Sequence, residues 1–212
     1  MSFAADPLPP EDFERLLTAR SASLGARLSP ASRSALASYL CELDRWRRTT
    51  NLTGRLSAGE LAEHALEALL AESLVPEGAR VVDIGSGGGL PGVALSIARP
   101  DLSMRLLEPR RKRAEFLRHV CRSVPLPNAS VLEGRAEDLA AGAFDIATCR
   151  AVGGLGRVVG AATFLRPGGL LLAWTTDPAT LARELDRSFE PAGVLPIPAS
   201  RQKAIAAFRR RT

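Results

Sequence analysis

Residues 81–92 read Val-Val-Asp-Ile-Gly-Ser-Gly-Gly-Gly-Leu-Pro-Gly, and this stretch decides the fold of the chain. It begins as a short apolar strand, turns through five glycines within eight residues, and reaches a helix start at Pro91. Glycine lets the backbone approach a ligand closely and adopt positive φ, and proline suits the first turn of a helix. Backbone N–H groups at the positive end of such a helix can hold a polar ligand. The stretch therefore predicts a ligand-binding loop between a strand and a helix.

Two classes of nucleotide cofactor compete for this loop. A dinucleotide site needs G-x-G-x-x-G directly after the strand. Counted from Gly85, the third glycine position is Leu90; counted from Gly87, the frame fits but starts late after the strand. The other pattern, Asp-x-Gly-x-Gly-x-Gly, resembles the motif of S-adenosylmethionine (SAM)-dependent methyltransferases with a Rossmann-like fold. Its positions are Asp83, Gly85, Gly87 and Gly89. The loop therefore favours SAM over NAD, and both over a purely structural turn.

Composition narrows the class of protein. The chain has 212 residues, 46% of them hydrophobic, which suits one domain of ordinary size with an extension. No stretch approaches the roughly 18 uninterrupted apolar residues of a membrane span, and the first ten residues do not resemble a secretory signal. Three cysteines stand far apart and there are two histidines, so we expect neither disulfides nor a metal site. We expect a cytoplasmic protein without a membrane partner.

The charge is basic and is carried almost entirely by arginine. The net charge is +5 with a pI near 9.8, and Lys112 and Lys203 are the only lysines. Arginine suits phosphate recognition, so a nucleic-acid partner is consistent with this excess. The same bias also follows from a GC-rich genome, so composition alone leaves the partner open. Candidate RNA contacts are Arg45, Arg47, Arg48, residues 110–113 and residues 209–211.

Hydrophobic periodicity divides the chain in two. Residues 1–75 read as a helical extension, with helices expected over 11–24, 31–48 and 60–74. Residues 76–212 alternate strands with helical stretches and form the expected SAM-binding methyltransferase domain. Strands are expected over 80–84, 103–108, 130–133, 144–149, 169–174 and 203–209, with 194–197 paired to the last. Helices are expected from Pro91 and over 111–123, 155–165 and 178–189. The fold class is α/β: a Rossmann-like, mostly parallel seven-stranded sheet with helices on both faces.

In such a sheet the ligand lies at the carboxyl ends of the strands. Glu108 ends the second strand, 25 residues beyond Asp83, where an acid can accept hydrogen bonds from ribose hydroxyls. Arg150 ends the fourth strand, where it could bind a carboxylate or a phosphate or form a structural ion pair. Cys149 lacks the context of a nucleophile, and we interpret it as a small strand residue. No Asn/Asp-Pro-Pro-Tyr/Phe segment for an exocyclic amine follows this strand.

From about Trp46 to Gly169 the chain resembles the bacterial 16S ribosomal RNA guanine-N7 methyltransferases, RsmG, also called glucose-inhibited division protein B, GidB. The pieces that carry this resemblance are Trp46, residues 51–53, His64 with Leu66, residues 83–87, residues 90–92, Lys112-Arg113, Phe116-Leu117, residues 135–137, Phe144-Asp145, Arg150-Ala151 and residues 167–169. Asn-Leu-Thr at 51–53 and Leu-Pro-Gly at 90–92 are its most specific parts. The chain departs from the family at Glu63, where arginine is usual, at Glu67-Ala68, where Asp-Ser is usual, and at Thr175, where lysine is usual.

The resemblance implies methylation of N7 of a guanine in 16S rRNA, at nucleotide 527 in the 530 loop of the small ribosomal subunit, by a monomer that uses SAM. It implies SAM contacts at Asp83, Gly85, Gly87, Leu90, Glu108, Ala136, Glu137 and Arg150. It places Asn51, Thr53, His64 and Arg150 on the catalytic side. The alternatives are a divergent SAM-dependent methyltransferase acting on another RNA or a small molecule, a SAM-binding module without catalysis, and a NAD-dependent oxidoreductase.

Overall fold

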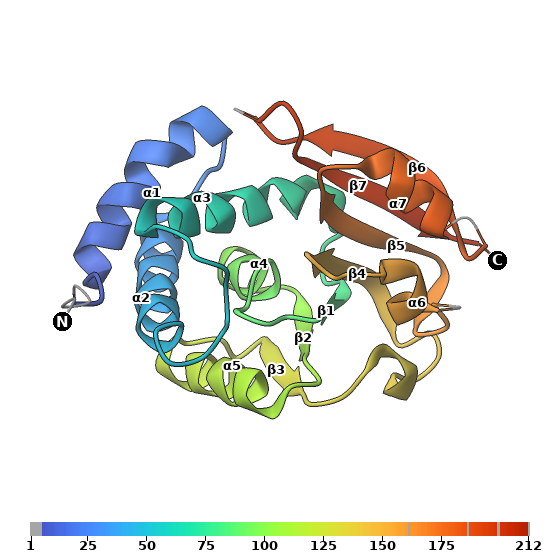
Figure 1. The fold of residues 1–212 in the computed structure, drawn as a ribbon, viewed down its shortest axis with the longest axis horizontal. Coiled ribbons are helices and arrows are strands. Elements are labelled where there is room, and N and C mark those ends of the chain that lie inside the picture. Colours follow the sequence, from blue (N-terminus) through green and yellow to red (C-terminus); the bar gives the residue numbers. More distant parts are fainter. Residues whose placement is uncertain (1–5, 161, 186, 199, 212) are drawn as a thin grey trace.

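The computed structural model describes residues 6–160, 162–185, 187–198 and 200–211. A seven-stranded sheet runs through the molecule, with the strand order β3-β2-β1-β4-β5-β7-β6 (Figure 1). The strands are β1 Arg80–Ile84, β2 Ser103–Leu107, β3 Ala129–Leu132, β4 Phe144–Arg150, β5 Leu165–Thr175, β6 Phe189–Pro196 and β7 Ala204–Arg210. Strands β1 to β5 pair in parallel, whereas β7 runs antiparallel between β5 and β6. The predicted fold class is confirmed.

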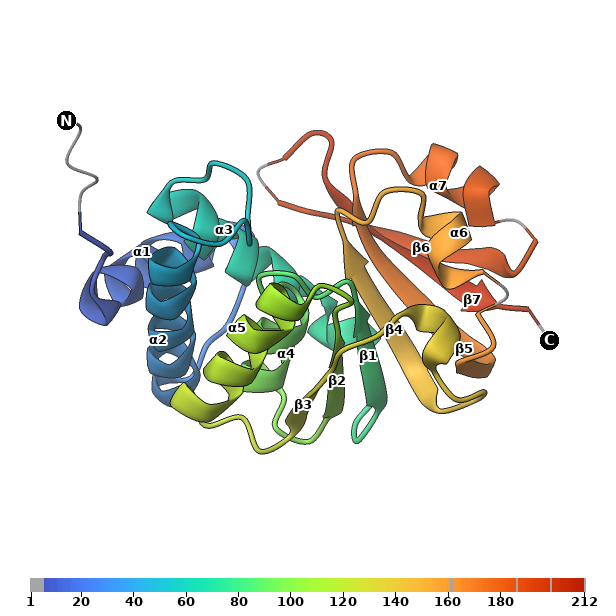
Figure 2. The ribbon, with the colours of Figure 1, turned by 60° about the horizontal axis from the view of Figure 1, so that its bottom comes forward.

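Helices cover both faces of this sheet (Figure 2). They are α1 Pro10–Leu24, α2 Pro30–Trp46, α3 Ala58–Leu69, α4 Gly92–Ala98, α5 Arg111–Ser123, α6 Leu155–Val159 and α7 Pro178–Leu185, with 3-10 turns at Leu70–Leu74 and Ala136–Asp138. Side chains alternate across β1: Val81 is buried under α1–α5, and Val82 is buried with residues of α6 and α7. This alternation follows from the two-residue period of a strand. Both sides of the central strands are therefore apolar core.

The N-terminal helices share one buried core with the sheet. Phe13 and Leu17 of α1 and Leu36 of α2 belong to the same apolar cluster as Val81 and Leu106. Serine side chains cap the starts of α2 and α3, and Ser57 and Glu60 form a reciprocal capping box at α3. These caps set where each helix begins, and they leave residues 47–57 as the connection that passes beside the glycine loop.

Three helices are shorter than the periodicity predicts. The helix expected over 155–165 ends at Val159, where Gly160 follows with a φ of 51°, and β5 already begins at Leu165. The helix expected over 178–189 ends at Leu185, because Phe189 starts β6. The helix expected over 60–74 changes to a 3-10 turn after Leu69. Leu165 and Phe189 continue the apolar spacing of a helix, but they are the first residues of β5 and β6.

In the part of the chain that the structure describes, no helix is both long and apolar enough to cross a membrane.

Candidate functional site

The glycine loop lies at the carboxyl ends of the parallel strands, directly after β1. Gly89 has a φ of 97°, and a Cβ there would lie 2.8 Å from Val93 Cγ2 and 3.0 Å from the Tyr39 hydroxyl. Gly92, the first residue of α4, is constrained by space rather than by φ. A Cβ at Gly92 would lie 2.6 Å from Leu106 Cδ2 and 2.8 Å from Asp83. The glycine that ends the Leu-Pro-Gly segment therefore lets α4 pack closely against β1 and β2.

Asp83 ties two strands to this helix start. One carboxylate oxygen accepts a hydrogen bond from the Thr148 hydroxyl of β4 at 2.8 Å, and the other accepts from the Gly92 N–H at 3.3 Å. The side chain is fully enclosed, and its burial raises the pKa of Asp83 to about 6 despite these hydrogen bonds. Asp83 thus fixes the geometry beneath the loop.

Glu108 at the end of β2 holds the loop from the other side. Its Oε2 accepts a hydrogen bond from the Gly87 N–H at 2.9 Å, and its Oε1 accepts from the Arg110 N–H at 2.9 Å. A carboxylate oxygen has two lone pairs, so each oxygen can accept one further hydrogen bond. Glu108 therefore positions the glycine loop and still has the capacity to accept from a hydroxyl.

The N-terminal helices reach the same loop. The Tyr39 hydroxyl of α2 donates to the Gly88 carbonyl at 2.6 Å, and burial raises the pKa of Tyr39, which keeps this hydroxyl protonated. A Cβ at Gly88 would lie 3.1 Å from Leu43 Cδ1 and 3.2 Å from the Leu52 carbonyl. The loop is therefore enclosed between the sheet and the N-terminal helices. Tyr39 carries no signal in the sequence beyond an apolar helix position.

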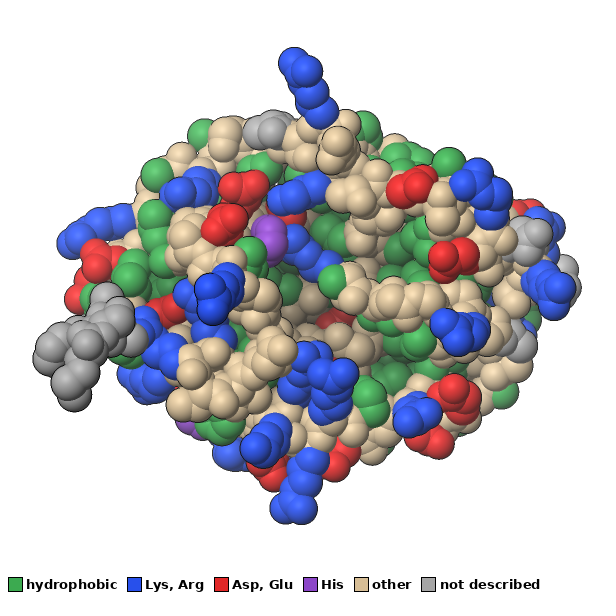
Figure 3. Space-filling view, in the orientation of Figure 1, with side chains coloured by type: hydrophobic (Ala, Val, Ile, Leu, Met, Phe, Trp, Pro, Cys, Tyr) green, Lys and Arg blue, Asp and Glu red, His purple; other side chains and the backbone are tan. Residues whose placement is uncertain are grey.

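A pocket of about 400 Å³ opens where these elements meet, and we call it the glycine-loop pocket. Among the predicted site residues it is lined by Asn51, Thr53, His64, Gly85, Gly87, Leu90 and Arg150. Arg113 from α5 also lines it. The face shown in Figure 3 is hollowed near its centre, with Lys or Arg side chains and a histidine at the wall. The structure thus brings together residues from positions 51 to 150 that the sequence placed in one site.

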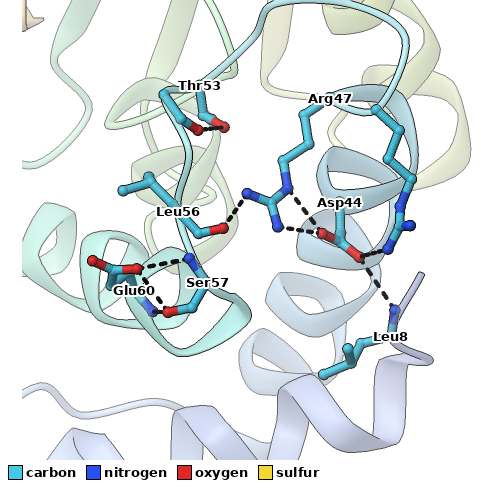
Figure 4. Close-up of polar contacts among 9 residues, drawn as sticks. Leu8, Asp44, Arg47, Thr53, Leu56, Ser57 and Glu60 are labelled. Carbon is cyan, nitrogen blue, oxygen red and sulfur yellow. Dashed lines mark hydrogen bonds and ion pairs between the residues drawn. The ribbon is translucent and has the colours of Figure 1, made fainter. Parts of the chain in front are cut away.

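The segment 51–56, which contributes residues to this pocket, is tied to the end of α2 (Figure 4). Arg47 donates to the Leu56 carbonyl, and its guanidinium also binds the carboxylate of Asp44. Asp44 is buried; burial would raise its pKa, but hydrogen bonds from Arg47, Arg48 and the Leu8 N–H lower it below its usual value. The position of residues 51–56 is therefore set by a buried ion pair.

Arg150 leaves the end of β4 and joins a cluster around Glu67 of α3. Its guanidinium donates to the His64 carbonyl at 3.2 Å and to Glu67 Oε2 at 2.9 Å. Lys203 Nζ, from the loop between β6 and β7, lies 2.6 Å from Glu67 Oε1. The Trp174 indole N–H donates to the Glu67 carbonyl at 3.1 Å. Glu67 is fully buried, so its charge is balanced by these two cations.

Members of the family that the chain resembles usually have a lysine at the position of Thr175. In this chain Lys203 supplies positive charge at the same end of the sheet. Thr175 lies at the end of β5, and its register partner on β7 is Ala204, which follows Lys203. The lysine therefore comes from the loop that leads into the neighbouring antiparallel strand, β7. In the sequence, Lys203 is distinguished only as one of two lysines in an arginine-rich chain.

A second pocket of about 440 Å³ lies at the ends of β4 and β5, and we call it the strand-end pocket. Arg150 and Ala151 line both pockets, so the two adjoin at the end of β4. Cys149 also lines the strand-end pocket; burial raises the pKa of this thiol far above its usual value, so it remains a neutral thiol. A neutral thiol agrees with the interpretation of Cys149 as a strand residue.

Four predicted cofactor contacts do not line either pocket: Asp83, Glu108, Ala136 and Glu137. Ala136 is buried in the apolar cluster that contains Leu107, and Glu137 is exposed beside it. Both follow β3, at the same edge of the sheet as the glycine loop. Their contact with the adenine stays a prediction.

Comparison with known proteins gives the family of this chain. A sequence model of GidB, described as rRNA small subunit methyltransferase G, matches residues 32–192. The chain belongs to this family. Ribosomal RNA small subunit methyltransferase G of Sorangium cellulosum (strain So ce56) is 43% identical over 173 residues, which cover 77% of this chain and 71% of that protein. The protein of the same name from Thermobifida fusca (strain YX) is 48% identical over 112 residues, which cover 52% of this chain and 47% of that protein.

Solved structures with the same fold are more distant from this GidB-family chain. A SAM-dependent methyltransferase from Aquifex aeolicus has a TM-score of 0.56 at 11% identity and covers 97% of this chain and 100% of that one. The cyclase SpnF has a TM-score of 0.63 at 16% identity and covers 88% and 98%. Likeness at this identity shows the fold alone, because one fold can host different functions.

The Tyr39 contact is testable by removing one oxygen. Tyr39→Phe keeps the ring but leaves the Gly88 carbonyl without its donor, so we expect the free energy of unfolding to fall by about 1–3 kcal/mol. Urea unfolding followed by circular dichroism measures this change. Ser38→Ala, one residue earlier on α2, is the control, because the Ser38 hydroxyl bonds only within its own helix and is exposed. Equal stability of Tyr39→Phe and wild type would show that the contact contributes nothing.

His64 makes the free energy of unfolding of this protein depend on pH. Burial, followed by the charge of Arg150, lowers the pKa of His64 from 6.5 to about 4. Between these values the unfolded chain binds a proton that the folded chain does not, so the stability due to neutral His64 is present above pH 6.5 and is lost as the pH falls toward 4. Relative to His64→Gln, wild type should lose on the order of 1–2 kcal/mol over this range, because solvent screens part of the effect at this half-buried ring.

The difference between the two proteins is the quantity to measure, by urea unfolding at several pH values. The raised pKa of Asp83 acts in an overlapping range with the opposite sign, since folded Asp83 takes up its proton first as the pH falls. That contribution is common to both proteins and cancels in the difference. A difference that stays constant from pH 7 to pH 4 contradicts the assignment.

Proposed function

We propose that this chain transfers the methyl group of SAM to N7 of a guanine in the 16S rRNA of the small ribosomal subunit. The observation that carries this proposal is the glycine-loop pocket, where the glycine loop, Arg150 and the Asn-Leu-Thr segment meet in a chain of the rRNA small subunit methyltransferase G family.

The residues of this pocket fit the parts of SAM. Gly85 and Gly87 expose backbone without side chains, so an extended ligand such as SAM can lie along the loop. Gly88 packs closely against the Leu52 carbonyl. Arg150 has five N–H donors, of which two are used by His64 and Glu67, so it can bind the carboxylate of the methionine moiety. Glu108 lies buried beside the loop and does not line the pocket, so its contact with the ribose hydroxyls stays a prediction. When bound, SAM supplies a methyl group on a positively charged sulfur.

The chemistry needs positioning more than proton transfer. Guanine N7 carries a lone pair and no proton, so the N7–carbon bond can form while the carbon–sulfur bond breaks and its electron pair stays on sulfur. Holding the two groups in line accounts for much of the rate enhancement. The lowered pKa of His64 keeps its ring neutral near pH 7, so His64 can line the pocket without repelling the sulfonium. The carboxylate of Glu67 balances positive charge near the site.

One of the predicted basic groups lies at the pocket mouth. Residues 110–113 start α5, and Arg113 lines the glycine-loop pocket. Arg47 and Arg48 instead pair with Asp44, and Arg45 pairs with Glu42. Residues 209–211 lie at the end of β7, and because β7 is antiparallel this end is at the opposite edge of the sheet from the pocket. We therefore propose that residues 110–113 contact the RNA backbone, which predicts salt-sensitive binding.

The test is methyl transfer from labelled SAM to small ribosomal subunits that lack the modification, and separately to naked 16S rRNA. We expect label in at least one of them, and borohydride–aniline cleavage should map it to a 7-methylguanine. Absence of label from both overturns the proposed substrate. Label at a different base, or in another RNA, instead identifies a divergent SAM-dependent methyltransferase.

The role of Arg150 is tested by cofactor affinity. Arg150→Ala should weaken S-adenosylhomocysteine binding at least tenfold, about 1.4 kcal/mol, because it removes a charge-assisted contact to the carboxylate. Isothermal titration calorimetry measures the affinity, with circular dichroism to confirm folding. Arg157→Ala is the matched control: this arginine follows the same strand but does not line the glycine-loop pocket. Arg150→Lys keeps the charge if Arg150→Ala fails to fold. Unchanged affinity in both Arg150 variants counts against the assignment.

A further inference from the structure

The strand-end pocket is not explained by cofactor binding. Its volume of about 440 Å³ is within the range of roughly 300–1,000 Å³ for small-molecule sites. It adjoins the glycine-loop pocket at Arg150 and Ala151, and the two together span the ends of β1, β4 and β5. If the methyl donor lies over the glycine loop, an acceptor in the strand-end pocket lies on the other side of Arg150. The pocket therefore has the place and the size for the group that is methylated.

The walls of this pocket carry opposite charges. Arg150 and Lys203 lie on the side of α3, gathered around Glu67. Asp177 and Glu184 lie on the side of α7, on the other face of the sheet. The Asp177 carboxylate caps the start of α7 by accepting from the Thr180 N–H at 2.9 Å, which fixes its position. Hydrogen-bond donors therefore face acceptors across the pocket.

Guanine matches this polarity. Its N7 and O6 are adjacent acceptors on one edge, whereas N1–H and the N2 amino group are donors on another. A base that presents N7 toward the methyl donor also presents O6 toward the same side, which here is the cationic side. Adenine carries an amino group, a donor, in place of O6. A cation at this position would favour guanine and disfavour adenine.

Lys203 is the cation best placed to act on a ligand. The Arg150 side chain is 17% exposed and already donates to His64 and Glu67. The Lys203 side chain is 33% exposed, and its ammonium has three donors, one of which is directed to Glu67 at 2.6 Å. Glu63 Oε1 lies farther from Lys203 Nζ, at 3.7 Å. Glu67 thus holds the Lys203 ammonium at the pocket wall. The remaining N–H groups of the ammonium can donate to an acceptor atom of a ligand.

We propose that the strand-end pocket receives the target guanine, turned out of its RNA stack, and that Lys203 donates a hydrogen bond to O6. The inference rests on the proposed function, since it assigns the acceptor base to a site beside the cofactor. Enzymes that act on a base inside folded nucleic acid take the base out of the stack and recognise its edges by hydrogen bonds. Trp174, Thr175 and Thr176 complete the end of β5 against which the base lies.

The test compares Lys203→Met with wild type on small subunits, with Arg201→Met as the matched control. Arg201 belongs to the same loop, is exposed and does not line the strand-end pocket. We expect kcat/KM to fall at least tenfold in Lys203→Met and to stay within twofold in Arg201→Met. S-adenosylhomocysteine affinity should stay within twofold of wild type in Arg201→Met, and in Lys203→Met it should fall by less than kcat/KM does, because Arg150 still pairs with Glu67. Lys203→Arg should retain part of the activity, since it keeps a cationic donor.

A second substrate separates contact with O6 from a role in holding Glu67. Subunits are reconstituted with 16S rRNA that carries 2-aminopurine, which lacks O6 but keeps N7, at the methylated position. The change in N7 reactivity is the same for every enzyme variant and cancels in the ratio of rates. Wild type should discriminate guanine from 2-aminopurine at least tenfold more strongly than Lys203→Met does.

The results for Lys203→Met and for wild type test the role of Lys203 and the proposed substrate separately. Equal discrimination by wild type and Lys203→Met shows that Lys203 does not read O6 and overturns the inference, as does unchanged kcat/KM in Lys203→Met. If wild type binds S-adenosylhomocysteine but labels neither RNA, the proposed substrate itself fails. The failure of the inference and the failure of the proposed function are therefore distinguished.

Discussion

The buried carboxylate of Glu67 is the interaction on which the site depends. An ion in the protein interior loses its hydration at a cost of several kcal/mol, and only close partners offset that cost. Glu67 finds them in Arg150 at the end of β4 and in Lys203 beyond β6, while its backbone carbonyl accepts from Trp174 of β5. One helical residue thus holds three separate parts of the chain at a common point. Because removing either cation would leave a buried charge underpaired, the arrangement is fixed rather than adjustable.

The glycine loop illustrates how a flexible sequence becomes a rigid structure. Glycines lose much conformational entropy on folding, so a loop rich in glycine is ordered only if its surroundings restrain it. Here Glu108 accepts from Gly87, Tyr39 donates to Gly88, and Asp83 accepts from Gly92. Two of these partners come from the ends of β1 and β2 and one from α2. The N-terminal helices are therefore part of what shapes the loop and do not merely cover the sheet.

Local patterns in the sequence predicted the positions of the strands well, but they did not predict the order of the strands in the sheet. Apolar runs bounded by turn residues identify β1, β2 and β4 to within a residue, because buried parallel strands leave a continuous apolar signal. The helices α6 and α7 were predicted too long, because Leu165 and Phe189 continue the helical spacing of apolar residues but start β5 and β6 instead. The family resemblance grouped Asn51, His64 and Arg150, and all three line the glycine-loop pocket.

Contacts between distant residues could not be predicted in this way. Lys203 and Glu67 are 136 positions apart, and each looks like an ordinary surface charge in its own segment. Tyr39 reads as one more apolar position of an amphipathic helix. What brings Lys203 to the site is the reversal of β7, a tertiary feature without a local pattern. The match to the family sequence model ends at residue 192, so it does not include Lys203 either.

The antiparallel course of β7 has a consequence for how the protein is made. Synthesis proceeds from the N-terminus, and a domain generally folds as a unit. The glycine loop and its supports, including Thr148 of β4, precede β5 in the chain, but the second cation of Glu67 comes only with Lys203, after β6. A nascent chain, or one clipped after β6, therefore contains the loop and Arg150 but leaves the buried carboxylate of Glu67 with one cation. The cluster around Glu67 is thus completed by the last strand pair, so its ion pairing depends on the integrity of the β6–β7 hairpin.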